Sequence, residues 1–314
     1  MSTQTEATTT TRRLLSSPMS SREESDEKTM IKPLKSPPST RKSLPSRVRR
    51  RFPFIGTTVT FPDESQWAIR EGLSDLKLQQ DYIPCEASQV YLVECLADPQ
   101  DLYDGLKEAV VKVKFQIRAS SDTLRELEEW LDENEAYYER NPDCETGKEM
   151  ERTRSALHLG TSCTSNPNRE TLKEVHALNL LDSHRGGHAP YLFDFSVATI
   201  EKRGYHYDEI VGGYLVFILM PKVPGLRIEH RWYWFLSKGK RDEIREAFKK
   251  ALLSVWDCGI EPHDISLDNL MWNEEKRKCY ILKFKDCTFF NEKKGGTKPE
   301  WTDKLWECWQ LAEH

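Results

Sequence analysis

The sequence predicts an α+β fold in which a small antiparallel sheet precedes a mainly helical region. Residues 90–93 and 109–115 are rich in β-branched residues and are interpreted as two strands around an acidic loop. Residues 214–220 form a continuous apolar run, which is typical of a buried central strand. Further along, apolar residues recur at helical spacing up to Gly259, so a helix is expected to end there.

The first 51 residues differ in composition from the rest of the chain. Residues 1–50 contain 18 Ser/Thr and 5 Pro and no aromatic residue. Such a segment buries too little apolar surface to offset its ordering entropy, so residues 1–51 are predicted to be a disordered tail. The folded domain is predicted over residues 52–314, beginning where aromatic residues begin at Phe52.

Charge is divided unevenly between these two parts. Residues 1–50 carry 11 Lys/Arg and 5 Asp/Glu, a net of +6, so the total of −5 leaves −11 on residues 51–314. An acidic folded body argues against nucleic acid as the principal ligand. The basic run at residues 47–51 fits either a nuclear-import or anionic-surface patch or a solvated linker.

Composition also bears on the cellular compartment. No apolar run approaches the ~18 residues that a membrane-spanning helix needs. The N-terminus lacks the apolar core of a secretory signal, and the eight cysteines include no C-x-x-C pair. Reduced thiols in a cytoplasmic or nuclear protein with no membrane span are therefore expected.

Two helical regions are expected between the strands. Residues 120–160 have helical periodicity, with Ser121 or Asp122 as the N-cap, and are expected to pack on the sheet. A second helix is expected to begin after Asn166 and to run to Leu181.

The loop after Gly259 carries the most informative pair of residues. Asp264 and Asn269 lie five positions apart, and the loop is followed by two apolar runs, 270–272 and 280–282, that predict a hairpin. Phosphoryl transfer needs a carboxylate that orients the attacking hydroxyl and an amide oxygen that holds a metal against the phosphates. An ordinary loop with a helix cap would show the same two residues.

This D-x-x-x-x-N spacing resembles the catalytic loop of the protein-kinase-like superfamily, in the form seen in fungal-type kinase-like proteins and in aminoglycoside and choline kinases. The resemblance implies that Asp264 and Asn269 are catalytic and that Asn269 is a metal ligand. It also implies a two-lobed fold with a small antiparallel-sheet lobe at about 52–220, a hinge at 221–225 and a shortened helical lobe at 226–314.

Two upstream residues extend the resemblance. Lys112 in A-V-V-K is similar to the strand lysine of kinases, which pairs with nucleotide phosphates. Glu174 follows where the kinase glutamate that pairs with this lysine would stand. The alternatives are a lysine on the wet face of a strand and a glutamate on a surface helix. Alternation places Lys114 on the same face as Lys112, so only one of the two need be functional.

The stretch M-P-K-V-P-G at 220–225 is similar to a kinase hinge. The resemblance implies that Met220 is the gatekeeper and that the Pro221 carbonyl and the Val223 N–H face adenine. A strand that simply leaves the sheet through a turn is an equal alternative.

Several departures weaken the resemblance, among them Pro262-His263-Asp264 where the family has H-x-D. The stretch 84–89, where a glycine-rich loop would stand, contains no glycine. Lys283 occupies the position of the metal-binding carboxylate, which Asp286 could replace only if the strand end were remodelled. Only 24 residues follow Phe290, too few for the substrate-binding helices of a protein kinase.

The resemblance therefore implies an ATP-binding, kinase-like protein with an impaired Mg²⁺ site. One expectation is a phosphotransferase that acts on a hydroxyl of an unknown protein or small molecule. The other is a catalytically inactive pseudokinase that acts as a binding or scaffolding module. Lys283 is expected either to neutralise a β- or γ-phosphate or to extend into solvent.

Overall fold

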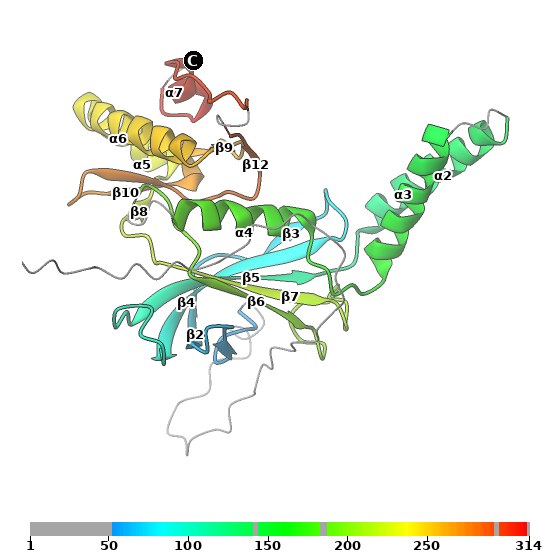
Figure 1. Cartoon of the computed structure of the whole chain (residues 1–314). Helices are drawn as coiled ribbons and strands as arrows, with labels where there is room; N and C mark the ends of the chain where they lie inside the picture. The colour runs from blue at the N-terminus through cyan, green and yellow to red at the C-terminus, as the bar shows by residue number, and fades with distance from the viewer. Residues whose placement is uncertain (1–51, 141–143, 183–186, 292–294, 313–314) are drawn as a thin grey trace, which may run out of the picture.

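A computed structural model describes residues 52–140, 144–182, 187–291 and 295–312. The predicted tail, residues 1–51, and its basic run lie outside the described residues. Within these residues the chain contains an antiparallel sheet and several helices, as the sequence predicts (Figure 1).

A seven-stranded antiparallel sheet forms the N-terminal part, with strand order β1-β2-β4-β5-β7-β6 and β3 paired to β4. The strands are β1 Thr58–Thr60, β2 Gln66–Gly72, β3 Lys77–Gln79, β4 Glu86–Ala97, β5 Glu108–Gln116, β6 Asp194–Thr199 and β7 Tyr214–Met220. The predicted strands at 90–93, 109–115 and 214–220 are confirmed, and β5 lies between β4 and β7.

The placing of residues 84–89 at the position of a glycine-rich loop is wrong. The stretch 84–89 is not a loop before the lysine strand, because β4 already begins at Glu86. The connection from β2 to β4 spans residues 73–85, includes β3 and likewise contains no glycine. The reason is that polar residues fill buried positions here: Glu86 and Gln89 are buried and Ser88 is half-buried, so the sequence shows no apolar–polar alternation.

Helix α4, Arg169–Asp182, covers one face of this sheet (Figure 1). Its buried Val175 and Leu178 share a core with Val216 of β7, whereas the neighbouring Phe217 faces a second core on the opposite side. The two cores follow from the period of two in a strand, which alternates side chains between the faces.

The N-cap of α4 differs from the expectation. Asn168 rather than Asn166 caps the helix, since its Oδ1 accepts from the Glu170 N–H at 2.7 Å. The Asn168 amide also donates to the Pro84 carbonyl at 2.6 Å, which ties the start of α4 to the residue pair that precedes β4.

Helices α2, Ser121–Tyr138, and α3, Cys144–Thr161, form a hairpin that extends away from the body (Figure 1). The expectation that this region packs on the sheet is wrong for α2, which has no buried residue. Its N-cap is Ser120, whose hydroxyl accepts from the Thr123 N–H. Charged residues on most faces of α2 leave it no apolar stripe wide enough to bury.

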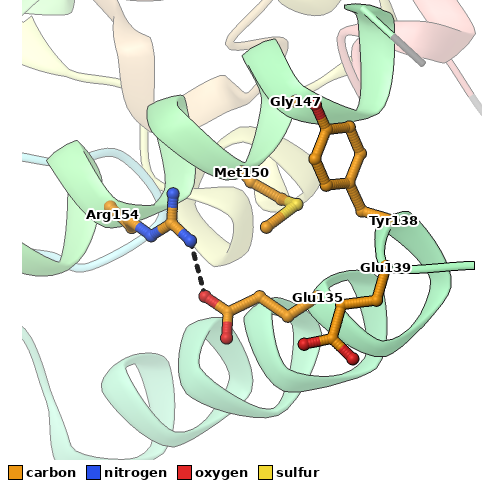
Figure 2. A pocket seen from close by; sticks show the side chains of 6 residues that line it. All are labelled: Glu135, Tyr138, Glu139, Gly147, Met150 and Arg154. Atoms are coloured by element: carbon orange, nitrogen blue, oxygen red, sulfur yellow. Dashed lines mark hydrogen bonds and ion pairs between the residues drawn. The ribbon is translucent and has the colours of Figure 1, made fainter. Parts of the chain in front are cut away.

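A pocket opens between these two helices, where Arg154 reaches Glu135 at 2.7 Å (Figure 2). All its lining residues belong to the hairpin itself: Glu135, Tyr138, Glu139, Gly147, Met150 and Arg154. None of the predicted site residues lines it.

The C-terminal part is built on helix α6, Lys238–Asp257, which packs on a three-stranded sheet β8-β10-β11. The remaining elements are β8 Leu226–Arg227, α5 His230–Phe235, β9 Ile260–Pro262, the short 3-10 helix η1 Leu267–Asn269, β10 Leu270–Asn273, β11 Lys278–Ile281, β12 Cys287–Phe289 and α7 Lys304–Cys308. The predicted hairpin is confirmed as β10 paired with β11.

Gly259 ends α6 as predicted. Its φ is +75°, and a Cβ at this position would lie 2.6 Å from the Phe290 carbonyl oxygen. A side chain would therefore clash with the strand that follows the loop. The end of the helix and the end of β12 are held together here by a Phe290 N–H bond to the Gly259 carbonyl at 2.9 Å.

One apolar cluster extends from the β7 face through α4 to α6 and to Trp309 beyond α7. Trp309 is buried and contacts the Phe248 ring, so the C-terminal aromatic residues belong to the core. In the described part of the chain, no helix has the length and apolarity that crossing a bilayer requires.

Candidate functional site

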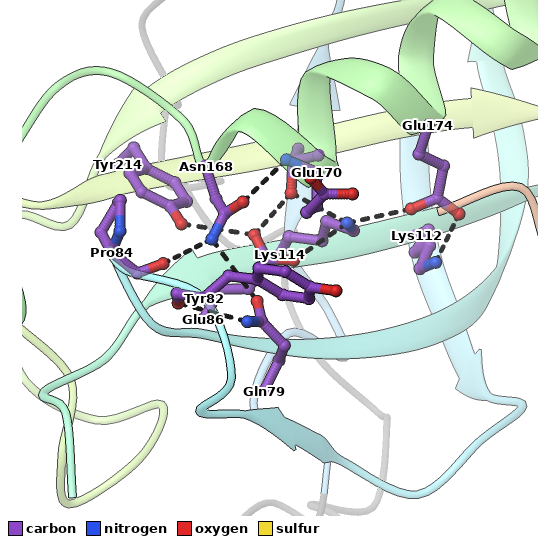
Figure 3. A network of polar contacts seen from close by, with 11 residues as sticks. Gln79, Tyr82, Pro84, Glu86, Lys112, Lys114, Asn168, Glu170, Glu174 and Tyr214 are labelled. Atoms are coloured by element: carbon purple, nitrogen blue, oxygen red, sulfur yellow. Dashed lines mark hydrogen bonds and ion pairs between the residues drawn. The ribbon is translucent and has the colours of Figure 1, made fainter. Parts of the chain in front are cut away.

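Lys112 and Glu174 meet, as the sequence predicts. The Lys112 ammonium lies 2.5 Å from Glu174 Oε1, although the two residues are 62 positions apart. Lys112 comes from β5 and Glu174 from α4, which covers that face of the sheet (Figure 3). The alternatives of a wet-face lysine and a surface glutamate are wrong, because α4 removes both side chains from bulk water.

Lys114 joins the same cluster from the next position on that face of β5. Its ammonium lies 2.9 Å from Glu174 Oε2 and 3.0 Å from Glu86 Oε1, and it donates to the Thr171 hydroxyl at 2.8 Å. Both lysines therefore hold Glu174, one on each carboxylate oxygen. Lys114 is fully buried, and sequence analysis gave it no role of its own.

Glu86 completes this group of buried charges. Its Oε2 accepts a hydrogen bond from the Thr171 hydroxyl. It also accepts one from the Tyr214 hydroxyl at 3.3 Å (Figure 3). Sequence analysis missed Glu86 altogether. A signal was present, since an acidic residue at the start of a strand opposite the end of the lysine strand is a natural partner for a buried lysine.

The opposite charges in this buried cluster shift one another's pKa values toward the charged forms. Burial alone would raise the pKa of Glu174, but Lys112 and Lys114 lower it to about 2. Burial lowers the pKa of Lys112, which Glu174 only partly offsets. For Lys114, burial is outweighed by Glu174 and Glu86, which raise its pKa. Glu174 is therefore an anion throughout the physiological pH range.

The loop between β9 and β10 positions Asp264 and Asn269. Asn269, the last residue of η1, is fully buried, and its amide donates to the Asp264 backbone carbonyl at 2.6 Å. Its carbonyl oxygen, Oδ1, has no hydrogen-bond partner among the described residues. A buried acceptor without a donor is rare in proteins, and a cation is one group that would satisfy it.

Lys283 pairs with Asp264. The Lys283 ammonium lies 3.1 Å from Asp264 Oδ2, and both side chains are partly exposed, at 31% and 40%. Lys283 thus reaches solvent and also contacts the Asp264 carboxylate, and its role toward a phosphate stays a prediction. Phe284 beside it is buried in the C-terminal core, which fixes the backbone from which Lys283 projects.

Asp286 is exposed, and its backbone carbonyl accepts from the His263 N–H at 2.9 Å. The described residues contain no group of three or more His, Cys, Asp or Glu side chains that could hold a metal ion. Asn269 thus offers a cation one unpaired oxygen. The role of Asp286 as a metal ligand stays a prediction.

The predicted hinge follows β7 directly. Met220 ends that strand, and residues 221–225 lead into β8. Within the described ranges, the Pro221 carbonyl and the Val223 N–H make no hydrogen bond to another protein group. They remain available to a ligand, as a hinge requires, although a plain strand exit would also leave them free.

Gly225 fixes the far end of this segment. Its φ is +122°, and a Cβ there would lie 2.4 Å from the Trp272 carbonyl oxygen. The chain passes so close to β10 that only glycine fits, which joins the segment to the hairpin next to the Asp264 loop.

Lys77 of β3 is a further cation near Asp264 that sequence analysis missed. Its pKa is lowered by partial burial and by the positive charges of Lys283 and Arg227, while Asp264 and Asp268 oppose this effect. Lys77 of β3 and Arg227 of β8 are therefore close enough to Lys283, the ion-pair partner of Asp264, for their charges to act on one another. The sequence carries no signal for this, because the three residues are far apart in the chain.

No protein family and no curated protein matches the sequence. Among solved structures, the chain is similar to the kinase PK-1 of the Cydia pomonella granulovirus, with a TM-score of 0.35 and 12% identity over 72% of this chain. The chain covers 55% of that kinase's length.

Proposed function

We propose that this protein is a kinase-like, ATP-binding protein. The observation that carries the proposal is the ion pair between Lys112 and Glu174, in which a buried carboxylate holds the ammonium of a lysine whose side chain is 15% exposed. In protein kinases a lysine held in this way pairs with nucleotide phosphates. The free backbone groups of Pro221 and Val223 support an adenine site next to Met220.

In this proposal, lysine side chains rather than a metal ion neutralise most of the phosphate charge. Lys283 stands where a metal-binding carboxylate is expected, and Lys77 adds a second cation. Two unit charges ~4 Å apart interact by about 4 kcal/mol at an effective dielectric near 20, so Lys283 would oppose a divalent cation by up to roughly twice that before screening. Mg²⁺ would have the Asn269 oxygen as a ligand but a cation beside it.

Phosphotransfer to a hydroxyl of a protein or small molecule is the first candidate activity. Asp264 would orient the hydroxyl, and Asn269 fixes the loop that carries it. A pseudokinase that binds nucleotide and acts as a binding module is the second candidate. The contact between Lys283 and Asp264 favours this second candidate, because the carboxylate that would accept the proton is already engaged by a cation.

The test uses the full chain in thermal-shift and calorimetric titrations with ATP, followed by an assay of ATP turnover with Mg²⁺. Lys112→Met should weaken ATP binding at least tenfold, whereas Lys298→Met, which removes an ion pair with Asp257 on the helical part, should leave it unchanged. Equal ATP affinities for the two variants would overturn the nucleotide site. Turnover above background would select the phosphotransferase over the pseudokinase.

A further inference from the structure

We propose that the pocket at the far end of the α2–α3 hairpin binds an arginine side chain from the basic run at residues 47–51 of a second copy of this chain. The pocket lies between the last turn of α2 and the first turns of α3 (Figure 2). It contains none of the residues of the proposed nucleotide site, so the inference does not depend on nucleotide binding.

The pocket combines an aromatic ring, a thioether and two carboxylates. The Tyr138 ring lies against Gly147, where an added Cβ would be 3.3 Å from the tyrosine hydroxyl oxygen and 3.4 Å from the ring. Glycine therefore leaves the space that the ring occupies. Met150 is buried and supplies apolar surface, while the carboxylates of Glu135 and Glu139 come from successive turns of α2 (Figure 2).

Negative charge exceeds positive charge in this pocket. Arg154 pairs with Glu135 at 2.7 Å, whereas Glu139 has no ion-pair partner in the described part of the chain. Like charges four positions apart on a helix repel each other, and one arginine compensates only one of the two carboxylates. α2 as a whole carries seven Asp/Glu and one Arg, a net of −6, with no basic residue in its last turn. A cation at this negative end of the helix would complete the pocket.

A guanidinium group suits both kinds of lining group. It is planar, it stacks on aromatic rings, it donates two parallel hydrogen bonds to a carboxylate, and it is more weakly hydrated than an ammonium. A lysine ammonium would pair with the carboxylates but would gain less from the Tyr138 ring and from Met150. The volume of about 390 Å³ lies in the range of pockets that accept organic groups. Arginine is therefore the expected occupant.

The chain itself carries a segment of matching charge. The basic run at residues 47–51, R-V-R-R-R, contains four arginines and no acidic residue. With Arg41 and Lys42 the net charge of residues 41–51 is +6, which equals the net charge of α2 with the opposite sign. Complementary charges of this kind steer two surfaces together and favour this contact over others.

The position of the run excludes the pocket of the same molecule. The run directly precedes Phe52, whose ring packs against Tyr91 of β4 at 6.3 Å. Five residues extend at most ~18 Å. The 18 residues of α2 span about 27 Å, and the hairpin extends away from the body (Figure 1). A pocket that projects in this way can instead approach the run at the surface of a second copy.

Calorimetric titration of the full chain with a synthetic peptide of residues 41–51 tests the pocket. Glu139→Gln and Glu128→Gln each remove one exposed charge near or on α2, but only Glu139 lines the pocket. Tyr138→Leu and Tyr137→Leu replace neighbouring tyrosines, of which Tyr137 is 52% exposed and lies outside the pocket. The pocket variants should weaken peptide binding at least about fivefold and the controls less than about twofold. Equal losses within either pair would overturn the pocket.

A second peptide tests the guanidinium. Replacing every arginine of the peptide by lysine keeps its charge but removes the planar group. The lysine peptide should bind at least about fivefold more weakly to the unaltered chain. Equal affinities would show that charge alone attracts the peptide and would overturn the assignment of the pocket to arginine.

Sedimentation velocity of the full chain tests the second copy as the source of the run. A reductant is kept present because Cys163 and Cys308 are exposed. A species heavier than the monomer should form at about 50 mM salt and decrease at about 0.5 M salt, where exposed charges are screened. It should be lost in Glu139→Gln and kept in Glu128→Gln. A chain that stays monomeric at concentrations above the dissociation constant of the peptide would overturn the contact between copies.

Discussion

The Lys283 ammonium lies 3.1 Å from Oδ2 of Asp264 and connects the segment after β11 with the loop before η1. This contact places a cation against the carboxylate on which phosphotransfer would depend. With both side chains partly exposed, the pair contributes little to stability, about 1 kcal/mol or less. The Lys283–Asp264 pair therefore matters for the chemistry of the Asp264 loop rather than for stability.

Lys283→Asp should make ATP binding more dependent on Mg²⁺, because it replaces a cation by a carboxylate beside the unpaired oxygen of Asn269. Thermal-shift titrations of ATP with Mg²⁺ or with EDTA measure this. The unaltered protein should be stabilised by ATP in both solutions, and the variant mainly with Mg²⁺. If ATP stabilised the unaltered protein only when Mg²⁺ is present, a phosphate-neutralising role for Lys283 would be refuted.

Asp264→Asn separates chemistry from binding if the protein transfers phosphate. Turnover should fall at least a hundredfold, while the dissociation constant for ATP should change less than about threefold, because the carboxylate acts mainly in the transition state. Steady-state kinetics and calorimetry on the same preparation give both values. Unchanged turnover would identify Asp264 as a structural residue of the loop.

Gly225→Ala should lower the free energy of unfolding by about 2 kcal/mol or more, because the added Cβ would meet the Trp272 carbonyl oxygen and φ is positive. Gly239→Ala is the matched control, since nothing lies within 4 Å of its added Cβ and the residue is in α6. The control should be neutral or stabilising by up to ~1 kcal/mol. Urea unfolding followed by circular dichroism compares them; equal midpoints would contradict the close approach.

The free energy of unfolding should fall as the pH drops below about 4.5. The pKa of Glu174 is about 2 in the folded protein against an ordinary value of 4.5. A lowered folded pKa gives stability that is complete above the ordinary value and is lost as the pH falls toward the folded value. Glu174→Gln should therefore show a shallower dependence between pH 4.5 and 2 than the exposed control Glu94→Gln. Parallel curves for the two variants would contradict a strongly paired Glu174.

Several features of this protein were determined by local sequence pattern. The strand at 109–115 and the buried run at 214–220 follow from β-branched and apolar composition, and both form as predicted. Gly259 ends α6 because its backbone conformation suits glycine. The hairpin after Asn269 follows from two apolar runs around a polar turn. These elements depend on residues close in the chain.

The environment of each charged residue was decided by the tertiary structure. Alternation along β5 shows that Lys112 and Lys114 share a face, but only the packing of α4 determines that this face is buried. Glu86 lies 28 positions from Lys114, and Lys283 lies 19 from Asp264. A sequence pattern reports which residues share a face of one element, whereas ion pairs between distant segments require the position of a second element.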